Sequence, residues 1–112
     1  MVPRQGDRVF EIAADLFSLL SSPTRLRIVC ALIEGEKNVT ELIEKVALSQ
    51  PNMSQHLGSL YRGGILARRR TGSQVFYRVE HAQVTSLCRA MRVCAEQPAA
   101  TPRPVRRSTK LI

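Results

Sequence analysis

The chain has 112 residues, with 17 Lys and Arg against 9 Asp and Glu and a net charge of +8. This length leaves room for one hydrophobic core, so we expect a single domain. A hydrophobic content of 44% and a charged content of 23% are typical of globular proteins and exclude a wholly disordered chain. No apolar run reaches the roughly 18 residues of a membrane helix, and the first residues lack the apolar segment of a secretory signal. We therefore expect a cytosolic protein that makes no membrane contact.

The positive charge is concentrated in two segments. Residues 62–78 contain five arginines and no acidic residue. Residues 97–112 contain four basic residues and three prolines, and because proline opposes regular helix we expect a flexible basic tail there. A basic patch predicts an anionic partner. Since only 4% of the residues are aromatic, stacking on single-stranded bases is poorly supported, and double-stranded DNA is favoured.

Two amphipathic helices are predicted first, after a flexible N-terminus over residues 1–8. Over residues 8–20, apolar side chains repeat at helical spacing and form one stripe. Ser22 is suited to cap the next helix, and Pro23 suits its first position. This second helix continues towards Gly35, and Cys30 falls on its apolar face.

Two further helices are separated by a short break. The third covers residues 39–46 and starts at Asn38 or Thr40. The fourth begins after Ser49 and ends at Gly63. Its apolar side chains repeat at i, i+4 and i+7, so one face is expected to be buried while the rest is polar. The polar residues along this helix that are candidates for contact with DNA are Gln50, Asn52, Ser54, Gln55, His56, Ser59 and Arg62.

The pattern then changes from helical to extended. Residues 65–70 and 75–79 predict two short strands that are joined by a glycine-containing turn, as in a β-hairpin. Helical spacing returns over residues 82–96, where a broad apolar face includes Cys88 and Cys94. The folded domain is therefore expected to span residues 9–96.

These elements together predict a mainly α-helical winged helix-turn-helix, with the order of four helices, a β-hairpin wing and a last helix. A helix fits the major groove of DNA, where Gln and Asn bond to adenine, and a hairpin brings charge to the backbone. A polar helix face on its own is more often merely solvated, but the arginine-rich hairpin beside it favours DNA binding. The residues of the hairpin predicted to contact DNA are Arg68, Arg69, Arg70, Ser73, Gln74 and Arg78.

The sequence also resembles a known family. The stretch Ser-Gln-Pro-Asn-Met-Ser-Gln-His-Leu at residues 49–57 is combined with Ile-Val-Cys-Ala-Leu around Cys30 and Val-Phe-Tyr-Arg at residues 75–78. In this combination, over about residues 9–95, the chain resembles the ArsR/SmtB family of bacterial repressors. The resemblance implies a homodimer, formed through the first and last helices, that binds a two-fold symmetric DNA operator and leaves it when a signal is sensed.

The metal sites of this family are poorly matched. One type uses a Cys-x-Cys pair on the helix before the recognition helix, but residues 41–44 contain no thiol. Another uses Asp and His along the last helix, where this chain has only Glu80 and His81 near the start. Too few nitrogen and sulfur ligands converge, so we expect neither a metal site of these types nor a cofactor.

The cysteines match a third arrangement better. Members of the sulfide- and persulfide-responsive branch, that of the biofilm growth-associated repressor, carry one cysteine in the second helix and one late in the last helix. Cys30 and Cys94 occupy the matching positions, which implies a thiol switch that joins them when reactive sulfur or oxidant rises. Cys88 is additional. It lies six residues from Cys94, a rise of about 9 Å, so these two cannot bridge within an intact helix.

Alternatives to the thiol switch remain open. The three cysteines could be ordinary buried thiols, since free cysteine is among the most buried residue types. Trivalent arsenic or antimony, or another thiophilic metal, could be bound by Cys30, Cys88 and Cys94. An enzyme is disfavoured because no oxyanion or substrate-pocket motif is present, and His56 lies on a different element from every cysteine.

Overall fold

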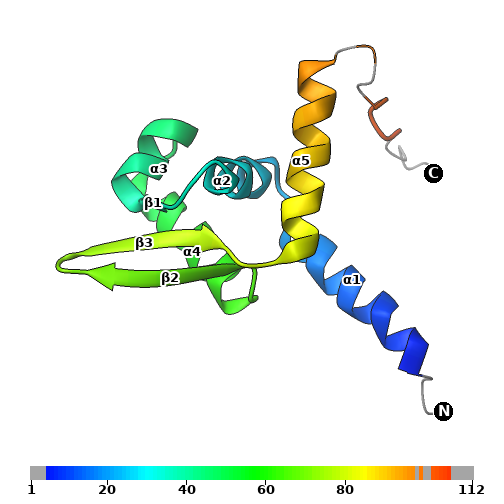
Figure 1. The fold of residues 1–112 in the computed structure, drawn as a ribbon, viewed down its shortest axis with the longest axis horizontal. Helices are drawn as coiled ribbons and strands as arrows, with labels where there is room; N and C mark the ends of the chain where they lie inside the picture. Colours follow the sequence, from blue (N-terminus) through cyan, green and yellow to red (C-terminus); the bar gives the residue numbers. More distant parts are fainter. Residues whose placement is uncertain (1–4, 98, 100–101, 107–112) are drawn as a thin grey trace, which may run out of the picture.

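The computed structural model describes residues 5–97, 99 and 102–106. In this part of the chain, five α-helices pack together with a three-stranded antiparallel sheet, whose hairpin projects away from them (Figure 1). The elements in chain order are η1 (Gln5–Asp7), α1 (Arg8–Leu19), α2 (Pro23–Ile33), β1 (Lys37–Asn38), α3 (Val39–Val46), α4 (Gln50–Arg62), β2 (Leu66–Thr71), β3 (Gln74–Val79) and α5 (Ala82–Glu96). This order confirms the predicted winged helix-turn-helix.

Two helices begin with serine caps, of which the sequence predicted the one at Ser22. The Ser22 Oγ accepts a hydrogen bond from the Arg25 backbone N–H at 3.3 Å, and Pro23 follows in the first turn of α2. The Ser49 Oγ accepts from the Asn52 backbone N–H at 3.4 Å at the start of α4. A serine cap satisfies one of the backbone donors that a helix start leaves unpaired, so both starts are set locally.

Helix α3 is defined at both ends by local geometry. Of the two predicted start residues, Asn38 is the cap: its Oδ1 accepts from the Glu41 N–H at 2.8 Å, and the Glu41 carboxylate accepts from the Asn38 N–H at 2.9 Å. This reciprocal pair is a capping box. At the other end Ala47 adopts a left-handed conformation, with φ 58° and ψ 57°, and its N–H bonds to the carbonyl of Ile43. The chain then turns into α4.

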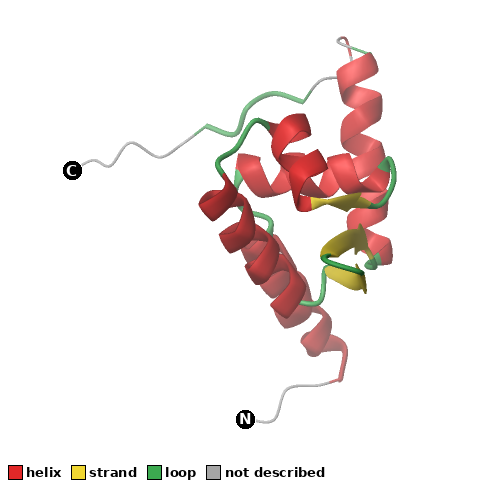
Figure 2. Cartoon of the chain, turned by 90° about the vertical axis from the view of Figure 1, so that its left-hand side faces the viewer, coloured by secondary structure: helices red, strands yellow, loops and turns green. Residues whose placement is uncertain are grey.

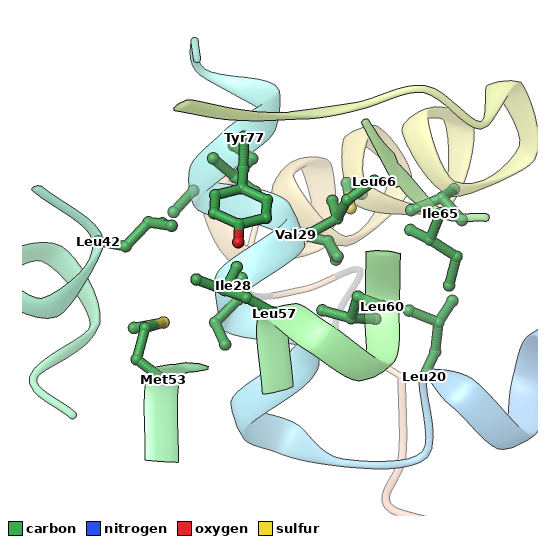
Figure 3. Packing of buried hydrophobic residues seen from close by; sticks show 14 residues of the cluster. Leu20, Ile28, Val29, Leu42, Met53, Leu57, Leu60, Ile65, Leu66 and Tyr77 are labelled. Carbon is green, nitrogen blue, oxygen red and sulfur yellow. The ribbon is translucent and has the colours of Figure 1, made fainter. Parts of the chain in front are cut away.

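The core joins α4 to the rest of the domain. Met53, Leu57 and Leu60, which repeat along α4, are all buried, as their spacing predicted. Figure 3 shows them facing Ile28 and Val29 of α2 and the other buried apolar residues. The remaining members of this core are Leu20, Ala31, Leu32, Leu42, Ile65, Leu66, Tyr77, Val84 and Cys88.

The sheet contains one more strand than the sequence predicted. The hairpin of β2 and β3 is longer than expected, because Thr71 pairs with Gln74 and only two residues remain in the turn. Gly72 in that turn has φ 62°, a conformation that favours glycine. Strand β1 pairs with β3 on the other side, so the strand order is β1-β3-β2. Figure 2 looks along the hairpin and shows it projecting from the helices towards the viewer.

The ends of the domain differ in part from the sequence prediction. Within the segment 1–8, predicted as flexible, residues 5–7 form a short 3-10 helix and Arg8 begins α1, while residues 1–4 lie outside the described part. Helix α1 buries none of its residues and extends away from the other helices (Figure 1). In the predicted tail, residues 97, 99 and 102–106 are exposed, and its other positions lie outside the described residues.

No single helix among the described residues is both long enough and apolar enough to cross a bilayer, although α1 and α2, bent by 97° to each other, satisfy the length and composition criteria as a pair.

Candidate DNA-binding surface and cysteine site

The exposed side of α4 carries a continuous polar stripe. Asn52, Gln55, Ser59 and Arg62 follow one another at i, i+3, i+7 and i+10, so they lie along one side of the helix. Three of them are exposed and Ser59 is half-buried. The predicted residues Gln50 and Ser54, also on α4, are exposed as well. Because the opposite side of α4 is buried in the core, the helix can present this stripe to a groove without losing its packing.

His56 differs from the other predicted DNA contacts. It is half-buried, and its Nδ1 accepts a hydrogen bond from the Arg25 Nε at 3.1 Å. The Arg25 guanidinium also donates to the carbonyl of Leu19 at 3.1 Å. Burial and the positive charge of Arg25 lower the pKa of His56. The ring thus links α4 to α2, an interaction between segments far apart in sequence, while its contact with DNA stays a prediction.

Arg69 of the wing is held by an acidic residue. Its Nε donates to the Glu36 carboxylate at 3.0 Å and its Nη2 at 2.7 Å, and its guanidinium lies 4.8 Å from the centre of the Phe76 ring. The hydrogen bond from Arg69 is the main cause of a lowered pKa of the Glu36 carboxylate, and the positive charge of Arg69 lowers it further. Glu36 lies just before β1, so this ion pair fastens the wing to the chain that enters α3.

The other arginines of the wing have different surroundings. Arg68 stacks on the ring of Tyr61, 3.9 Å from its centre. Arg78 makes an exposed ion pair with Glu80 at 3.3 Å. The Arg70 side chain makes no ion pair or hydrogen bond with any residue that the structure describes, and it is exposed. Its charge is therefore the one that the protein itself neutralises least.

The turn of the wing holds the last two predicted contacts. Ser73 is exposed at the tip. The Gln74 side-chain oxygen accepts a hydrogen bond from Asn38 Nδ2 at 3.4 Å, so the residue that caps α3 also contacts the wing. Their roles towards DNA stay predictions.

The three cysteines are reduced thiols in different environments. Cys30 on α2 is half-buried and Cys88 on α5 is only 3% exposed. Cys88 lies beside Cys30 in the wall of one cavity between α2 and α5, and burial first, then the interaction with Cys30, raises the pKa of Cys88 to about 12. Cys94 is half-buried near the end of α5. The structure thus brings Cys88 to Cys30, and the predicted pairing of Cys30 with Cys94 stays a prediction.

An acidic residue connects the cysteine-bearing helices to α3. Glu34, at the end of α2, forms ion pairs with Lys45 of α3 at 3.3 Å and with Arg92 of α5 at 3.4 Å. The hydrogen bond from Lys45 is the main cause of a lowered pKa of Glu34. Within the described ranges, no three His, Cys, Asp or Glu side chains are grouped so that they could hold a metal ion.

Known proteins with similar sequences establish the family. Residues 22–68 match the family model described as bacterial regulatory protein, arsR family. The chain is 42% identical over 89 residues to the biofilm growth-associated repressor of Xylella fastidiosa strain 9a5c, and the match covers 78% of each chain. The chain belongs to the ArsR family. As an ArsR-family protein it is a DNA-binding transcriptional repressor and not an enzyme.

Solved structures of ArsR-family relatives agree with this assignment. The crystal structure of the repressor BigR from Xylella fastidiosa matches with a TM-score of 0.74 at 38% identity, over 83% of this chain and 95% of that one. Reduced HlyU from Vibrio cholerae N16961 matches with a TM-score of 0.78 at 28% identity, over 85% of this chain and all of the other. The ArsR-type winged helix-turn-helix is therefore shared over nearly the whole of these relatives.

Proposed function

We propose that this ArsR-family protein is a homodimer that represses transcription from a two-fold symmetric operator and releases it when Cys30 is modified by reactive sulfur or oxidant. The observation that carries the DNA-binding part is the polar stripe of α4 beside the arginine-rich wing. The observation that carries the sensing part is that the half-buried Cys30 lies beside a second thiol, Cys88 of α5, in the wall of one cavity.

The dimer is supported by the exposed apolar side chains of α1. Phe10 is 72% exposed and Phe17 is 62% exposed, and Val9 and Ile12 on the same helix are also more than half exposed. Exposed apolar side chains clustered on one helix are typical of an interaction surface. Val93 of α5 is 50% exposed as well, so α5 has an apolar side chain to contribute to the same interface. In a two-fold symmetric dimer, the α1 and α5 helices of the two protomers would cover these apolar side chains.

In DNA binding, the polar stripe of α4 and the arginine-rich wing would have different roles. In a two-fold symmetric dimer the α4 helices enter successive major grooves, with half-sites about one helical turn apart or a multiple of it. Asn52, Gln55 and Arg62 then face base edges or the adjacent backbone. Arg68 and Arg70 of the wing meet phosphates, which strengthens binding to every sequence without specifying one.

Induction would act through the contact between α2 and α5. Cys30 lies on α2, whose buried residues pack against α4. A covalent link from Cys30 to a cysteine of α5 changes how the proposed dimer helix α5 sits on α2. Because α5 joins the two protomers, this alters the separation of the two α4 helices and weakens their simultaneous contact with the operator. Sequence matching proposes Cys94 as the partner, and Cys88 is the alternative on the same helix.

The test uses the reduced full-length protein and a duplex selected by it from a random-sequence pool. We expect the selected duplex to contain an inverted repeat and to bind far more tightly than a scrambled duplex. Adding glutathione hydropersulfide should then release the duplex, whereas the Cys30→Ser variant should bind it equally well and no longer respond. A selected duplex without symmetry would contradict the dimeric mode, and release from Cys30→Ser would contradict the thiol switch. Arsenite in a parallel titration tests the alternative, and release by arsenite alone would favour a metalloid sensor.

A further inference from the structure

Helices α2, α3 and α5 line a cavity of about 460 Å³. Figure 1 shows α2 between α3 and α5, and both of these helices pack against it. Much of the cavity wall is apolar, and its apolar side chains are those of Leu26, Ala31, Val46, Met91 and Ala95. Protein sites for small molecules are mostly apolar hollows of about 300–1,000 Å³ with a few polar groups. The cavity has the size and the kind of wall that such a site needs.

The wall of the cavity is apolar at depth and charged at its edge. Ala31 and Cys88 in the wall are buried. The charged residues of the wall are all exposed, and they are Arg27 of α2, Glu34 at the end of α2, Lys45 of α3 and Arg92 of α5. A ligand with an apolar body and one charged end can place its body against the buried wall and keep its charge at the exposed edge, where no charge has to be buried.

The charged edge favours an anion. Three of its side chains are cations and one is a carboxylate, so positive charge is in excess. Two of the cations, Lys45 and Arg92, already bind a carboxylate, that of Glu34, at 3.3 and 3.4 Å. Arg27 makes no ion pair with any residue that the structure describes. Because a guanidinium binds a carboxylate through two parallel hydrogen bonds, Arg27 is suited to bind the carboxylate of a ligand.

The ion pairs of Glu34 leave the edge of the cavity adaptable. The side chains of Glu34, Lys45 and Arg92 are between 39% and 51% exposed, and exposed ion pairs contribute little to stability. Either cation can therefore exchange Glu34 for another carboxylate at little cost. Met91 in the wall is unbranched and flexible, so it can adjust to the shape of an apolar ligand.

We propose that this cavity reversibly binds a small aliphatic carboxylic acid. The apolar chain of the acid lies against Leu26, Val46 and Met91, and its carboxylate is bound by Arg27, with Lys45 and Arg92 on the other side of the edge. This inference goes beyond the proposed function, because it needs no reaction of a cysteine. The bound acid contacts α3, which precedes α4 and packs against it, so the site adjoins the helix-turn-helix.

Isothermal titration calorimetry with octanoate tests the site in the reduced full-length protein. Matched compounds separate the charge from the chain: octan-1-ol has the chain without the charge, octylammonium has the opposite charge, and acetate has the carboxylate without the chain. We expect octanoate to bind at one site per chain, octan-1-ol to bind at least about tenfold more weakly, and the other two compounds to give no measurable binding. Equal binding of octanoate and octylammonium would overturn the proposed recognition of a carboxylate.

Paired variants test whether octanoate occupies the cavity. Arg27→Gln removes a cation of the edge, and Arg89→Gln makes the same change at a position that is not among the described residues of the wall. Ala95→Phe places a ring in the wall, and Ala90→Phe places the same ring elsewhere on α5. We expect Arg27→Gln to weaken octanoate binding by about tenfold or more and Ala95→Phe to weaken it likewise, because its ring takes up the same space. Arg89→Gln and Ala90→Phe should bind octanoate like the unaltered protein.

The unaltered protein provides a second measurement that needs no variant. Cys30 and Cys94 are both half-buried, but only Cys30 is among the described residues that line the cavity. Bound octanoate should slow the reaction of Cys30 with iodoacetamide and leave that of Cys94 unchanged, with half of the protection at the dissociation constant from calorimetry. Mass spectrometry reads the two rates on separate tryptic peptides, residues 28–37 and 93–106, since the bond before Pro104 resists trypsin.

The outcomes separate this inference from the thiol switch. Equal protection of Cys30 and Cys94, or protection of neither, would overturn the site. Absence of octanoate binding, together with weaker self-association of Ala95→Phe in sedimentation equilibrium, would assign the cavity to a contact with a second copy of the chain instead. Cys30→Ser should bind octanoate like the unaltered protein even if the thiol switch proves wrong, and loss of the octanoate site would leave the thiol switch standing.

Discussion

The ion pair between Glu36 and Arg69 makes a quantitative prediction about the wing. In the structure the Arg69 guanidinium is engaged by the Glu36 carboxylate at 2.7 and 3.0 Å. Glu36→Gln removes the charge that holds it, and the freed guanidinium gains access to one phosphate. Each phosphate contact contributes a slope of about 0.9 in log affinity against log salt, which corresponds to roughly tenfold tighter binding per protomer at 0.1 M salt. We therefore expect Glu36→Gln to bind DNA more tightly than the unaltered protein and to lose that gain as salt rises.

Matched variants separate this effect from a general change in charge. The assay is fluorescence anisotropy of a labelled duplex over a series of salt concentrations. Arg70→Ala should lower the slope by about 0.9 per protomer, the contribution of one phosphate contact, since the Arg70 side chain has no partner among the described residues. Arg69→Ala should leave the slope nearly unchanged, and adding Arg69→Ala to Glu36→Gln should cancel its gain. If Arg69→Ala flattens the slope as much as Arg70→Ala does, Arg69 already contacts phosphate in the complex and the reasoning is refuted.

Three further predictions concern the dimer, the recognition helix and pH. Phe10→Glu should shift the dimer towards monomer in sedimentation equilibrium, because burying a phenylalanine contributes about 1.5–3 kcal/mol; an unchanged dimer would exclude α1 from the interface. Leu57→Ala should lower the free energy of unfolding by about 2–5 kcal/mol in denaturant titrations, whereas Gln55→Ala should melt like the unaltered protein and change only its base preference. Equal destabilisation by the two would contradict the assignment of buried and reading faces. The folded-state pKa of His56 lies below its ordinary value of 6.5, so the contribution of its neutral ring to stability is complete above that pH and is lost as pH falls through the folded-state pKa. His56→Gln should reduce this acid sensitivity in denaturant titrations across that pH range, and an identical pH dependence would assign it to other groups.

Local signals were sufficient to predict most of the fold. The predicted bounds of residues 39–46 and 82–96 coincide with α3 and α5, because helix spacing and caps are encoded within a few neighbouring residues. Strand β1 was missed because two residues are too few to show an alternating pattern. Its existence depends on pairing with Phe76 and Tyr77, far along the chain.

The candidate site was predicted less completely, since its contacts join distant segments. The sequence placed His56 and Arg69 near DNA, but no spacing rule relates them to Arg25 and Glu36. Helix geometry alone showed that Cys88 and Cys94 cannot bridge each other within an intact helix, and it left open which of them meets Cys30. Which of them does so depends on how α5 is rotated against α2, and that rotation is determined by the packing of the whole core.

The left-handed Ala47 has a consequence for how the protein searches DNA. A glycine at this position, common in the turns of helix-turn-helix motifs, would have several backbone wells of similar energy. Alanine has a single narrow left-handed well, at a cost of about 1–2 kcal/mol. The turn from α3 to α4 therefore behaves as a stiff corner and not as a hinge. If α4 enters the DNA groove as proposed, we expect it to meet every site at the same tilt, so that adaptation comes from the wing, the proposed dimer contact or the DNA.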